Sequence, residues 1–529
     1  MRYTLSSVLA ATPFFPSLTA CDRYASNRSP KIIDAPQVAA NFPDVKGIEL
    51  LSPAFADPSS IPPTFANGTS GPTPQDVMVQ YLKHLSRSNQ YVTYHESEAL
   101  QSEETRSIPY ITLSNGKSGQ KVRIWIQGGM HGDEPAGDQA VLALIGKLAA
   151  DNRWAAKVLE KVDLLLLPRY NSDGVEYFQR ALASNYDGNR DHAILVREQT
   201  RKLKRLQSSF DPHIVVDQHE YTGVGAVASK YIRAQDILVS ANKNQNIHKA
   251  IRALNQDIVE KVFSAVGEKG LRYGPYFTTS VSGNSITINE ADASPAANHK
   301  NAGLGQTVTF LTETRGIRLS DQHFQRRVAT ALIASTTIID TAVNDFENVY
   351  KTIEDSRKAF IDSRDDIVVL DEQQTTSTSI TFIDATSGAL SNVTVTSKNS
   401  DPPNILITRA RPKAYVFSRA WADVAERLRI LGVRVDVLQQ DYVGTVEALT
   451  IASADLASTK FEGIAATTVT TTAATRNVSI PKGGFWVDTK QKNAAFTFVL
   501  LEPEHYTSQV HYNAIPVEKG DEYLVFRVV

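Results

Sequence analysis

Short apolar runs alternate with longer amphipathic stretches over much of this chain, and this alternation constrains the fold more than any other feature of the sequence. Apolar runs between turn signals predict strands at residues 110–113, 122–126, 164–167, 214–216 and 308–311. Helical periodicity is present at residues 137–150, 193–207, 241–266 and 320–339. Strands that are apolar throughout are buried on both faces. The pattern therefore predicts an α/β domain in which helices flank a central β-sheet.

This α/β domain is expected to span residues 74–345. Thr73-Pro-Gln-Asp76 combines a hydroxyl, a proline and an acid in the order of a helix start, so a helix is expected to run to about residue 88. Residues 21–73 carry recurring prolines and no hydrophobic period, which is typical of an extension or linker. Residues 346–365 form a charged connector, and residues 366–529 predict a smaller, mainly β domain of unknown role.

Residues 366–529 are rich in threonine and alternate between apolar and polar side chains. Residues 415–438 predict a strand-helix-strand unit, and residues 496–501 predict a further strand. The Thr-rich run at 467–475 is of low complexity and predicts an exposed loop. This region shows no catalytic constellation and no internal repeat.

Residues 1–20 resemble an export signal. Arg2 supplies a short basic region, and the apolar run that follows is too short to cross a bilayer. Leu18-Thr-Ala-Cys21 also resembles a bacterial lipobox, so a secreted protein and a lipoprotein anchored through Cys21 are both open. Cys21 is the only cysteine, which excludes an intramolecular disulfide. No later segment has about 20 uninterrupted apolar residues, so no membrane span is expected.

The charge balance narrows the class of partner. The chain has 55 Lys and Arg against 57 Asp and Glu, and its net charge is -2. Such a balance gives no electrostatic footprint for nucleic acid or for an acidic membrane surface. A small or peptidic partner is therefore expected, and no nucleic acid.

His131 and Glu134 stand in the most distinctive stretch, Ile124-Trp-Ile-Gln-Gly-Gly-Met-His-Gly-Asp-Glu134. An apolar strand runs into glycines and then presents an imidazole and a carboxylate three residues apart, two side chains that Zn²⁺ accepts as ligands. The spacing alone decides little, because His95-Glu-Ser-Glu98 has it too. A metal site needs a third ligand, and a catalytic one also needs a base.

His219 is the candidate for the third ligand. Open α/β sheets gather ligands at the carboxyl ends of their strands, and His219 follows the run 214–216 as His131 follows its own. A core histidine with satisfied hydrogen bonds is the ordinary alternative. Glu220, the next residue, is expected to be a surface carboxylate without a role.

Glu313 is the candidate for the base. It ends an apolar and β-branched run, where a carboxylate without a partner is costly to bury. An ion pair with Arg315 is the ordinary explanation. Two strand residues of the same parity share a face only while the strand continues, however, and Gly316 indicates that it has ended.

Two further motifs, Asn171-Ser-Asp-Gly174 and Asp187-Gly-Asn-Arg190, lie between these points. The ordered set of His-x-x-Glu, Asn-Ser-Asp-Gly, Asp-Gly-Asn-Arg, a strand-end His and a strand-end Glu resembles the zinc metallocarboxypeptidases of the carboxypeptidase A type. That family has Asn-Pro-Asp-Gly at the second motif, and this chain differs there by Ser172. The resemblance covers about residues 74–345. It implies a mixed central β-sheet flanked by helices and an enzyme that hydrolyses the C-terminal peptide bond of peptides or proteins.

The resemblance also implies roles for single residues. His131, Glu134 and His219 would hold one Zn²⁺ per chain and leave a coordination position open, as catalytic zinc sites do. Glu313 would be the general base that activates water. Arg180, nine residues before Asn189, would stabilise the oxyanion of the tetrahedral intermediate.

The Asp-Gly-Asn-Arg motif carries the remaining implied roles. Asn189 and Arg190 would bind the terminal carboxylate of the substrate, for which a guanidinium fork is well shaped. Asp187 would accept a hydrogen bond from the ring nitrogen of His131 that faces away from the metal, and so fix its tautomer.

The chain departs from the family before the catalytic Glu, where the family has a tyrosine that closes over the substrate. The best match for this loop puts Thr279 at that position, and Tyr276 is a candidate substitute three residues earlier. The residue that selects the substrate side chain falls near Ile286, which favours an apolar pocket. Glu290 and Asp292 nearby would instead favour a basic side chain.

Three functions are consistent with these residues. An exported zinc carboxypeptidase accounts for all the motifs. A zinc amidase or deacylase on the same scaffold, acting on cell-wall peptides or acylated amino acids, would not need Arg190. A non-catalytic binding module is the third, and it would be expected to have lost a metal ligand or the base.

Overall fold

The computed structural model describes residues 27–223, 227–283 and 285–529. The expected export signal at 1–20 and the possible lipid anchor at Cys21 lie outside these residues. None of the helices in the described ranges combines the length and the apolarity that a bilayer span requires.

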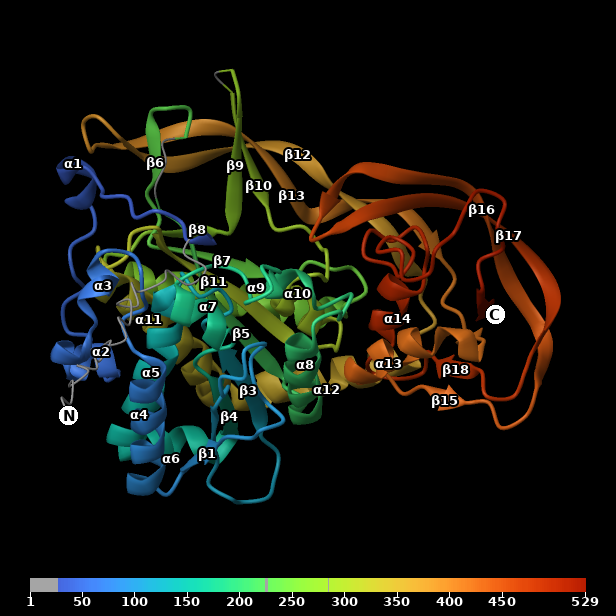
Figure 1. Ribbon diagram of the computed structural model, residues 1–529, viewed down its shortest axis with the longest axis horizontal. Helices are drawn as coiled ribbons and strands as arrows, with labels where there is room; N and C mark the ends of the chain where they lie inside the picture. Colours follow the sequence, from blue (N-terminus) through green and yellow to red (C-terminus); the bar gives the residue numbers. More distant parts are fainter. Residues whose placement is uncertain (1–26, 224–226, 284) are drawn as a thin grey trace, which may run out of the picture.

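A mixed sheet forms the centre of the molecule, and it confirms the predicted fold class (Figure 1). Within the described residues it has eight strands in the order β1-β2-β4-β3-β5-β11-β7-β8. The four central strands β4, β3, β5 and β11 are parallel, and antiparallel pairs join β2 to β4 and β7 to β11. The bounds are Val92–His95 for β1, Tyr110–Leu113 for β2, Val122–Gln127 for β3, Val162–Leu167 for β4, Ile214–Thr222 for β5, Ile237–Ala241 for β7, Tyr273–Pro275 for β8 and Val308–Ile317 for β11.

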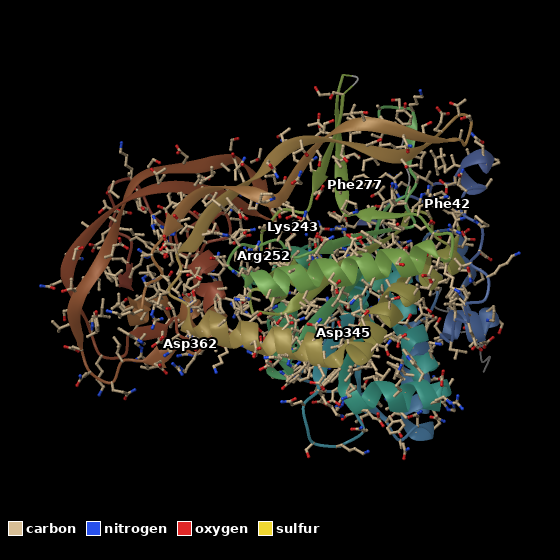
Figure 2. All side chains as sticks on the ribbon, turned by 180° about the vertical axis from the view of Figure 1, so that it is seen from behind. Phe42, Lys243, Arg252, Phe277, Asp345 and Asp362 are labelled. Atoms are coloured by element: carbon tan, nitrogen blue, oxygen red, sulfur yellow. The ribbon has the colours of Figure 1, made fainter. Side chains whose placement is uncertain are left out.

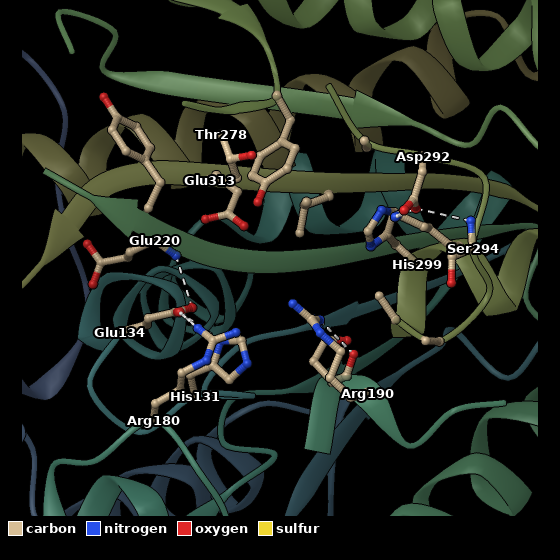
Figure 3. A pocket seen from close by; sticks show the side chains of 18 of the residues that line it. His131, Glu134, Arg180, Arg190, Glu220, Thr278, Asp292, Ser294, His299 and Glu313 are labelled. Carbon is tan, nitrogen blue, oxygen red and sulfur yellow. Dashed lines mark hydrogen bonds and ion pairs between the residues drawn. The ribbon is translucent and has the colours of Figure 1, made fainter. Parts of the chain in front are cut away.

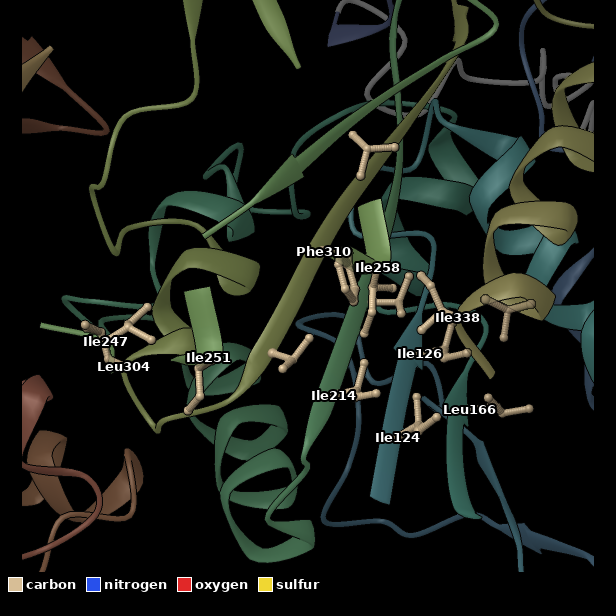
Figure 4. Close-up of a cluster of buried hydrophobic side chains, with 14 of the residues drawn as sticks. Ile124, Ile126, Leu166, Ile214, Ile247, Ile251, Ile258, Leu304, Phe310 and Ile338 are labelled. Atoms are coloured by element: carbon tan, nitrogen blue, oxygen red, sulfur yellow. The ribbon is translucent and has the colours of Figure 1, made fainter. Parts of the chain in front are cut away.

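Helices cover both faces of this sheet because its strands are apolar on both. Ile124 and Ile126 of β3 face one core cluster, which Figure 4 shows with Ile214 and Phe310 of the neighbouring strands. Trp125 faces the opposite way, into a second cluster. The first face is covered by α5 (Pro135–Ala150), α9 (Lys249–Gly267), α11 (Phe324–Asn344) and α12 (Phe346–Asp362). Figure 2 shows the molecule from this side, with Arg252 of α9, Asp362 of α12 and Asp345 between α11 and α12 labelled. The second face is covered by α8 (Glu198–Phe210) and α10 (Asn298–Gly303).

Several predicted bounds differ from the observed ones. The predicted helix 241–266 contains the end of β7, and its helix begins only at Lys249. The predicted connector 346–365 is mostly the helix α12, which packs Phe346, Val349 and Ile353 into the core. The predicted helix start is close, since α4 spans Gln75–Ser88, but its N-cap is Pro74 rather than Thr73. The other helices of this part are α6 (Asn152–Lys161), α7 (Ser172–Tyr177) and the short 3₁₀ turn η3 (Gly188–Arg190).

Two further sheets make the remainder of the molecule rich in β structure, as predicted. In the described part of the chain, one has the order β6-β12-β13-β10-β9, so that strands from both sides of the predicted boundary at residue 366 share it. Its bounds are Tyr231–Arg233 for β6, Phe277–Ser282 for β9, Ser285–Glu290 for β10, Ile367–Asp384 for β12 and Leu390–Arg409 for β13. The other has the order β15-β18-β14-β19-β16-β17. Its bounds are Ala414–Phe417 for β14, Asp436–Val437 for β15, Tyr442–Phe461 for β16, Ile464–Ile480 for β17, Phe485–Asp488 for β18 and Val525–Val528 for β19.

Two predictions for this C-terminal part are wrong. The Thr-rich run 467–475 is not a loop but the middle of β17, where the buried Thr467 and Val469 alternate with the exposed Thr468 and Thr470. Threonine suits such a pleated surface because it is β-branched. The predicted strand 496–501 belongs to the helix α14 (Ala494–Leu500), which is buried all round. A short apolar run does not reveal by its period which of the two structures it adopts. The remaining helices here are η4 (Arg419–Trp421) and α13 (Ala422–Ile430).

A buried ion pair joins the N-terminal extension to strand β11 of the central sheet. Both guanidinium nitrogens of Arg315 on β11 donate to Asp34, at 2.7 and 2.8 Å, and His323 Nε2 lies 3.1 Å from the same carboxylate. Burial alone would raise the pKa of Asp34, but the hydrogen bonds and charges of His323 and Arg315 hold it at about 2. The extension then forms the short helices α1 (Pro36–Ala39), α2 (Pro53–Ala56), η2 (Pro58–Ser60) and α3 (Pro63–Ala66).

We expect Asp34→Asn to lower the free energy of unfolding by about 3 kcal/mol, because it leaves the buried Arg315 guanidinium without its counter-charge. Urea denaturation of the two proteins at pH 7 measures this difference. The wild-type advantage is complete above the unfolded pKa of Asp34 and is lost as the pH falls toward its folded value of about 2. Asp44→Asn, at an exposed position of the same extension, is the control. An equal effect of both changes would contradict a stabilising role for this ion pair.

Candidate active site

The turn between β3 and α5 carries His131 and Glu134. Gly129 has a left-handed backbone with φ of +61°, and a Cβ at Gly132 would overlap the backbone of Gly174. Glycine is therefore required at both positions, because it has no side chain to clash. Glu134 is the N-cap residue of α5, and Pro135 fills the first helical position. The strand thus releases both side chains toward the same edge of the sheet.

His131, Glu134 and His219 converge in the buried interior. One ligand atom of each lies within 4.8 Å of the others, which makes them the one metal-type group found among the described residues. The two carboxylate oxygens of Glu134 lie 2.7 Å from His131 Nδ1 and 2.8 Å from His219 Nδ1. Figure 3 shows Glu134 and His131 side by side at the cavity. Two imidazole nitrogens and one carboxylate are the donor set of a catalytic zinc site, so these residues fit that metal. By contrast, His95 bonds to Thr112 and joins no such group.

The other ring nitrogen of each histidine faces an aspartate. His131 Nε2 lies 3.1 Å from Asp187 Oδ1, as the resemblance implies, and His219 Nε2 lies 3.2 Å from Asp217 Oδ1. A carboxylate in this place keeps the proton on Nε2 and leaves the Nδ1 lone pair free for a metal. Sequence analysis missed Asp217, although it stands two residues before His219 on β5 and must therefore share its face.

These carboxylates are ionised although they are buried. Burial alone would raise the pKa of Asp217, but the charge of the His219 ring when it is protonated, together with its hydrogen bond, holds it at about 2. Burial opposes ionisation of Glu134 and Asp187 as well. The charge of His131 nevertheless holds the pKa of both below the usual range, with His219 adding to the effect on Glu134 and Arg180 to that on Asp187.

Glu313 lies beside the metal ligands because of the sheet register. In the parallel pair of β5 and β11 it is the partner of His219, and its side chain is 8% exposed. Burial raises its pKa to about 7, and the negative charge of Glu134 adds to this while His219, His131 and Arg180 oppose it. Figure 3 shows the Glu313 carboxylate directed into the cavity.

Arg315 forms no ion pair with Glu313, as expected, but the expected reason, that the strand ends at Gly316, does not hold. The prediction that the strand ends at Gly316 is wrong, because β11 continues to Ile317. Arg315 instead forms its ion pair with Asp34 of the N-terminal extension.

Arg180 connects the metal ligands with the solvent-exposed cavity. Its Nη2 donates to Asp187 Oδ2 at 2.9 Å, and its Nη1 lies 3.3 Å from Glu134 Oε1. Burial alone would lower the pKa of Arg180, but the charges of Asp187 and Glu134 outweigh it, so the pKa is raised above its usual value. Its side chain is 41% exposed, so the guanidinium is both held in place and accessible from the cavity.

Asn189 and Arg190 form the short η3 turn, which the Asp187 carboxylate caps by accepting from Asn189 N at 2.8 Å. The amide oxygen of Asn189 accepts from Asn298 N at 2.8 Å, and this contact fixes the side chain. Arg190 Nη1 donates to the carbonyl oxygen of Asn189 at 2.9 Å. Within the part of the chain that the structure describes, Arg190 forms no salt bridge, and it lines the cavity.

A cavity of about 450 Å³ unites these groups. Seven of the nine predicted site residues line it, while Asp187 and His219 lie behind its wall. The seven are His131, Glu134, Arg180, Asn189, Arg190, Tyr276 and Glu313.

In the loop that departs from the family, some of the predicted residues line the cavity and others do not. Tyr276 lines the cavity, and burial raises the pKa of its hydroxyl, so that it stays protonated at neutral pH. Thr279 does not line the cavity, whereas Thr278 does. The expectation that the selecting residue lies near Ile286 is wrong, because the β9–β10 hairpin carries Ile286 to a separate cavity.

Glu290 and Asp292 were the acidic candidates for side-chain selection. Glu290 pairs with Lys243 at 2.8 Å and does not line the cavity. Asp292 lines it, but forms an ion pair with Lys300.

The prediction of a surface position for Glu220 is also wrong. Its side chain is buried, because β5 extends to Thr222 and carries Glu220 past the end of the apolar run. Its carboxylate pairs with Arg327 Nε at 2.7 Å and accepts from Ala136 N, at the start of α5, at 3.1 Å. It therefore offsets the positive end of α5 and the Arg327 charge together.

Comparison with known proteins identifies the family. A zinc carboxypeptidase profile matches residues 78–219, a range that holds all the predicted site residues except Tyr276 and Glu313. Carboxypeptidase 2 of Trichophyton tonsurans is 43% identical over 516 residues, which cover 96% of each chain. The Trichophyton rubrum protein of that name is 42% identical over the same span. The chain belongs to the zinc carboxypeptidase family. The resemblance drawn from the sequence is thereby confirmed, and the protein is a metallopeptidase of this family.

Solved structures also match, at low similarity. A metallo-carboxypeptidase from Burkholderia cenocepacia has a TM-score of 0.40 and 14% identity, covering 50% of this chain and 69% of its own. Thrombin-activatable fibrinolysis inhibitor has a TM-score of 0.41 and 14% identity, covering 58% and 80%.

We expect Asp217→Asn to weaken zinc binding by about 10- to 100-fold, because an amide holds the His219 ring nitrogen less firmly than a carboxylate does. Competition with a chromophoric chelator measures the affinity. Asp163→Asn, on β4 and away from the cavity, is the control. Unchanged affinity in Asp217→Asn would show that this contact does not support the metal site.

Proposed function

We propose that this protein is an exported zinc metallocarboxypeptidase that removes the C-terminal residue of peptides or proteins. The observation that carries the proposal is one cavity, which the metal-type residues His131 and Glu134 line together with Glu313 and Arg190. Among the described residues, the Arg190 guanidinium forms no salt bridge. Membership of the zinc carboxypeptidase family and the resemblance to carboxypeptidase 2 over nearly the whole chain support it.

In the proposed reaction, residues of the chain would hold the metal at the peptide carbonyl and transfer the proton. One zinc ion per chain, held by His131, Glu134 and His219, would supply Lewis acidity toward the peptide carbonyl. Glu313 accepts the proton of the attacking water and passes it to the leaving amine. A general base works best when its pKa lies near the working pH, and the value of about 7 that burial gives Glu313 suits this task.

Arg180 and Tyr276 act on the substrate around the scissile bond. The guanidinium of Arg180 is held by Asp187 before the substrate arrives, so it stabilises a developing oxyanion without reorganising. The Tyr276 hydroxyl keeps its proton and is a donor at the cavity wall. It takes the place of the family's substrate-closing tyrosine.

Arg190 and Asn189 select the end of the peptide. A guanidinium without an ion pair in a half-enclosed cavity attracts a carboxylate, and its fork matches the two oxygens. The terminal carboxylate of a peptide is the substrate group that fits this position. This preference for a free C-terminus separates a carboxypeptidase from an amidase on the same scaffold.

Export rests on residues 1–20, whose basic start and short apolar run are those of a signal peptide. We propose release of the mature protein to the outside of the cell. Anchoring through a lipidated Cys21 is the alternative, and mass spectrometry of the mature N-terminus distinguishes the two.

We expect Glu313→Gln to lower kcat about a hundredfold or more, because the amide does not accept the proton of water. The variant should still bind one zinc per chain, as measured by metal analysis. Glu268→Gln, exposed just beyond α9, is the control. Loss of zinc together with activity would instead make Glu313 a ligand or a structural residue.

A panel of short peptides, each free or amidated at the carboxyl end, tests the proposed function directly. We expect cleavage of the free peptides only, complete loss of cleavage after chelation, and recovery on addition of zinc. Arg190→Ala should lower kcat/KM for the free peptides about a hundredfold, since a charged hydrogen-bonded pair is lost. Equal cleavage of amidated and free peptides, with neither rate changed by Arg190→Ala, would favour an amidase or deacylase instead.

A further inference from the structure

The hairpin formed by β16 and β17 brings part of the C-terminal region to the active-site cavity. Figure 1 shows these two long strands curving back from the right of the molecule toward its centre. Phe461, the last residue of β16, lines the cavity. The segment after α14 also contributes to the wall, through Tyr506, His511 and Tyr512. Residues far apart in the chain therefore enclose one space.

The tip of this hairpin is bonded to the catalytic half. The backbone N–H of Asp187 donates to Glu462 Oε2 at 2.9 Å. Glu462 and Gly463 form the turn, and both have left-handed backbones, with φ of 48° and 79°. Such a two-residue turn matches the twist of the strands that it joins. The tip is thus held at the residue that orients both His131 and Arg180.

Further hydrogen bonds fix the hairpin to the segment after α14. Asn513 Nδ2 donates to the carbonyl oxygen of Ala465 at 2.6 Å, and Thr467 donates to Asn513 Oδ1 at 2.6 Å. Farther from the tip, Arg409 pairs with Glu504 at 2.6 Å, and Thr471 of β17 donates to the same carboxylate. The hairpin is therefore a braced part of the cavity wall.

Phe461 stands at the mouth of this cavity. Its side chain is 62% exposed, whereas the groups at the bottom, such as His131 and Glu313, are 2% and 8% exposed. A peptide whose terminal carboxylate reaches Arg190 must leave the cavity through its mouth, so the residues upstream of the scissile bond pass the tip. Exposing a phenylalanine ring brings no benefit to folding, because its hydrophobic stabilisation comes from burial.

We infer that Phe461 is a specificity-determining residue whose ring packs against the side chain immediately upstream of the scissile bond. This inference rests on the proposed carboxypeptidase function and names a substrate class for it: peptides with a large apolar residue in the penultimate position. Glu462 is a positioning residue, which acts through Asp187 and holds the tip at the site.

Two peptides with the same C-terminal residue, one with phenylalanine and one with glycine in the penultimate position, test the inference. Wild-type enzyme is expected to have a kcat/KM about tenfold higher for the phenylalanine peptide, the scale of burying part of an aromatic ring. Phe461→Ala should remove this preference through KM, so that kcat/KM for the phenylalanine peptide falls toward that for the glycine peptide, while Phe461→Trp retains it. Leu456→Ala, at a 67% exposed position of the same strand, should behave as wild type.

Glu462 gives an independent measurement. Glu462→Ala should reduce the preference as Phe461→Ala does, because the tip loses its bond to Asp187. Glu462→Gln should keep it, since the amide oxygen accepts the same N–H.

The outcomes separate the two proposals. If wild type cleaves neither peptide, the carboxypeptidase function itself fails. If wild type cleaves both and Phe461→Ala lowers both rates equally, or changes neither, the function stands and the inference about the tip is overturned.

Discussion

The Asp187 carboxylate is the contact on which the site depends, because three functional groups share it. It orients His131, holds the Arg180 guanidinium and caps the turn that carries Asn189 and Arg190. Without the carboxylate, the His131 imidazole and the Arg180 guanidinium would share Glu134 as their counter-charge, at a cost in free energy. The backbone N–H of the same residue bonds to the C-terminal hairpin. One residue therefore couples metal binding, oxyanion stabilisation and the cavity wall.

The sheet supplies the rest of the geometry through its register. His219 and Glu313 are direct partners on the parallel strands β5 and β11, and His131 follows β3 on the other side of β5. A slip of one residue would turn these side chains to the opposite face. The apolar residues of the same strands prevent such a slip, since they fill two separate cores above and below the sheet. Packing therefore fixes the spacing of the catalytic groups.

Much of this arrangement could be predicted from the sequence, because the end of a strand is a local feature of the chain. The positions of His131, His219 and Glu313 followed from apolar runs and the rule that ligands gather at one edge of a sheet. Errors arose where a strand continued beyond its apolar residues, as it does at Glu220 and Gly316. The run 467–475 was misjudged because composition does not show the partner strand that its residues alternate against.

Contacts between distant segments could not be predicted from the sequence. Asp217 carried a usable signal in its parity with His219, but Phe461 and Glu462 carried none, because no local pattern tells that a hairpin tip meets a turn more than two hundred residues away. Likewise, no local pattern indicates that Arg315 pairs with Asp34 of the proline-rich extension. Both contacts depend on the folded chain as a whole.

The C-terminal region shares its packing with the catalytic half and is not an appended module. Tyr415, Phe417 and Phe496 belong to the same core cluster as Ile124 of the central sheet. Strand β13 pairs with β10, and β12 pairs with β6, so the backbone ladder also crosses between the halves. A fragment that ended near residue 345 would expose this apolar surface and leave β6 and β10 without these partners. The active site therefore belongs to a folding unit that includes residues with no catalytic group of their own.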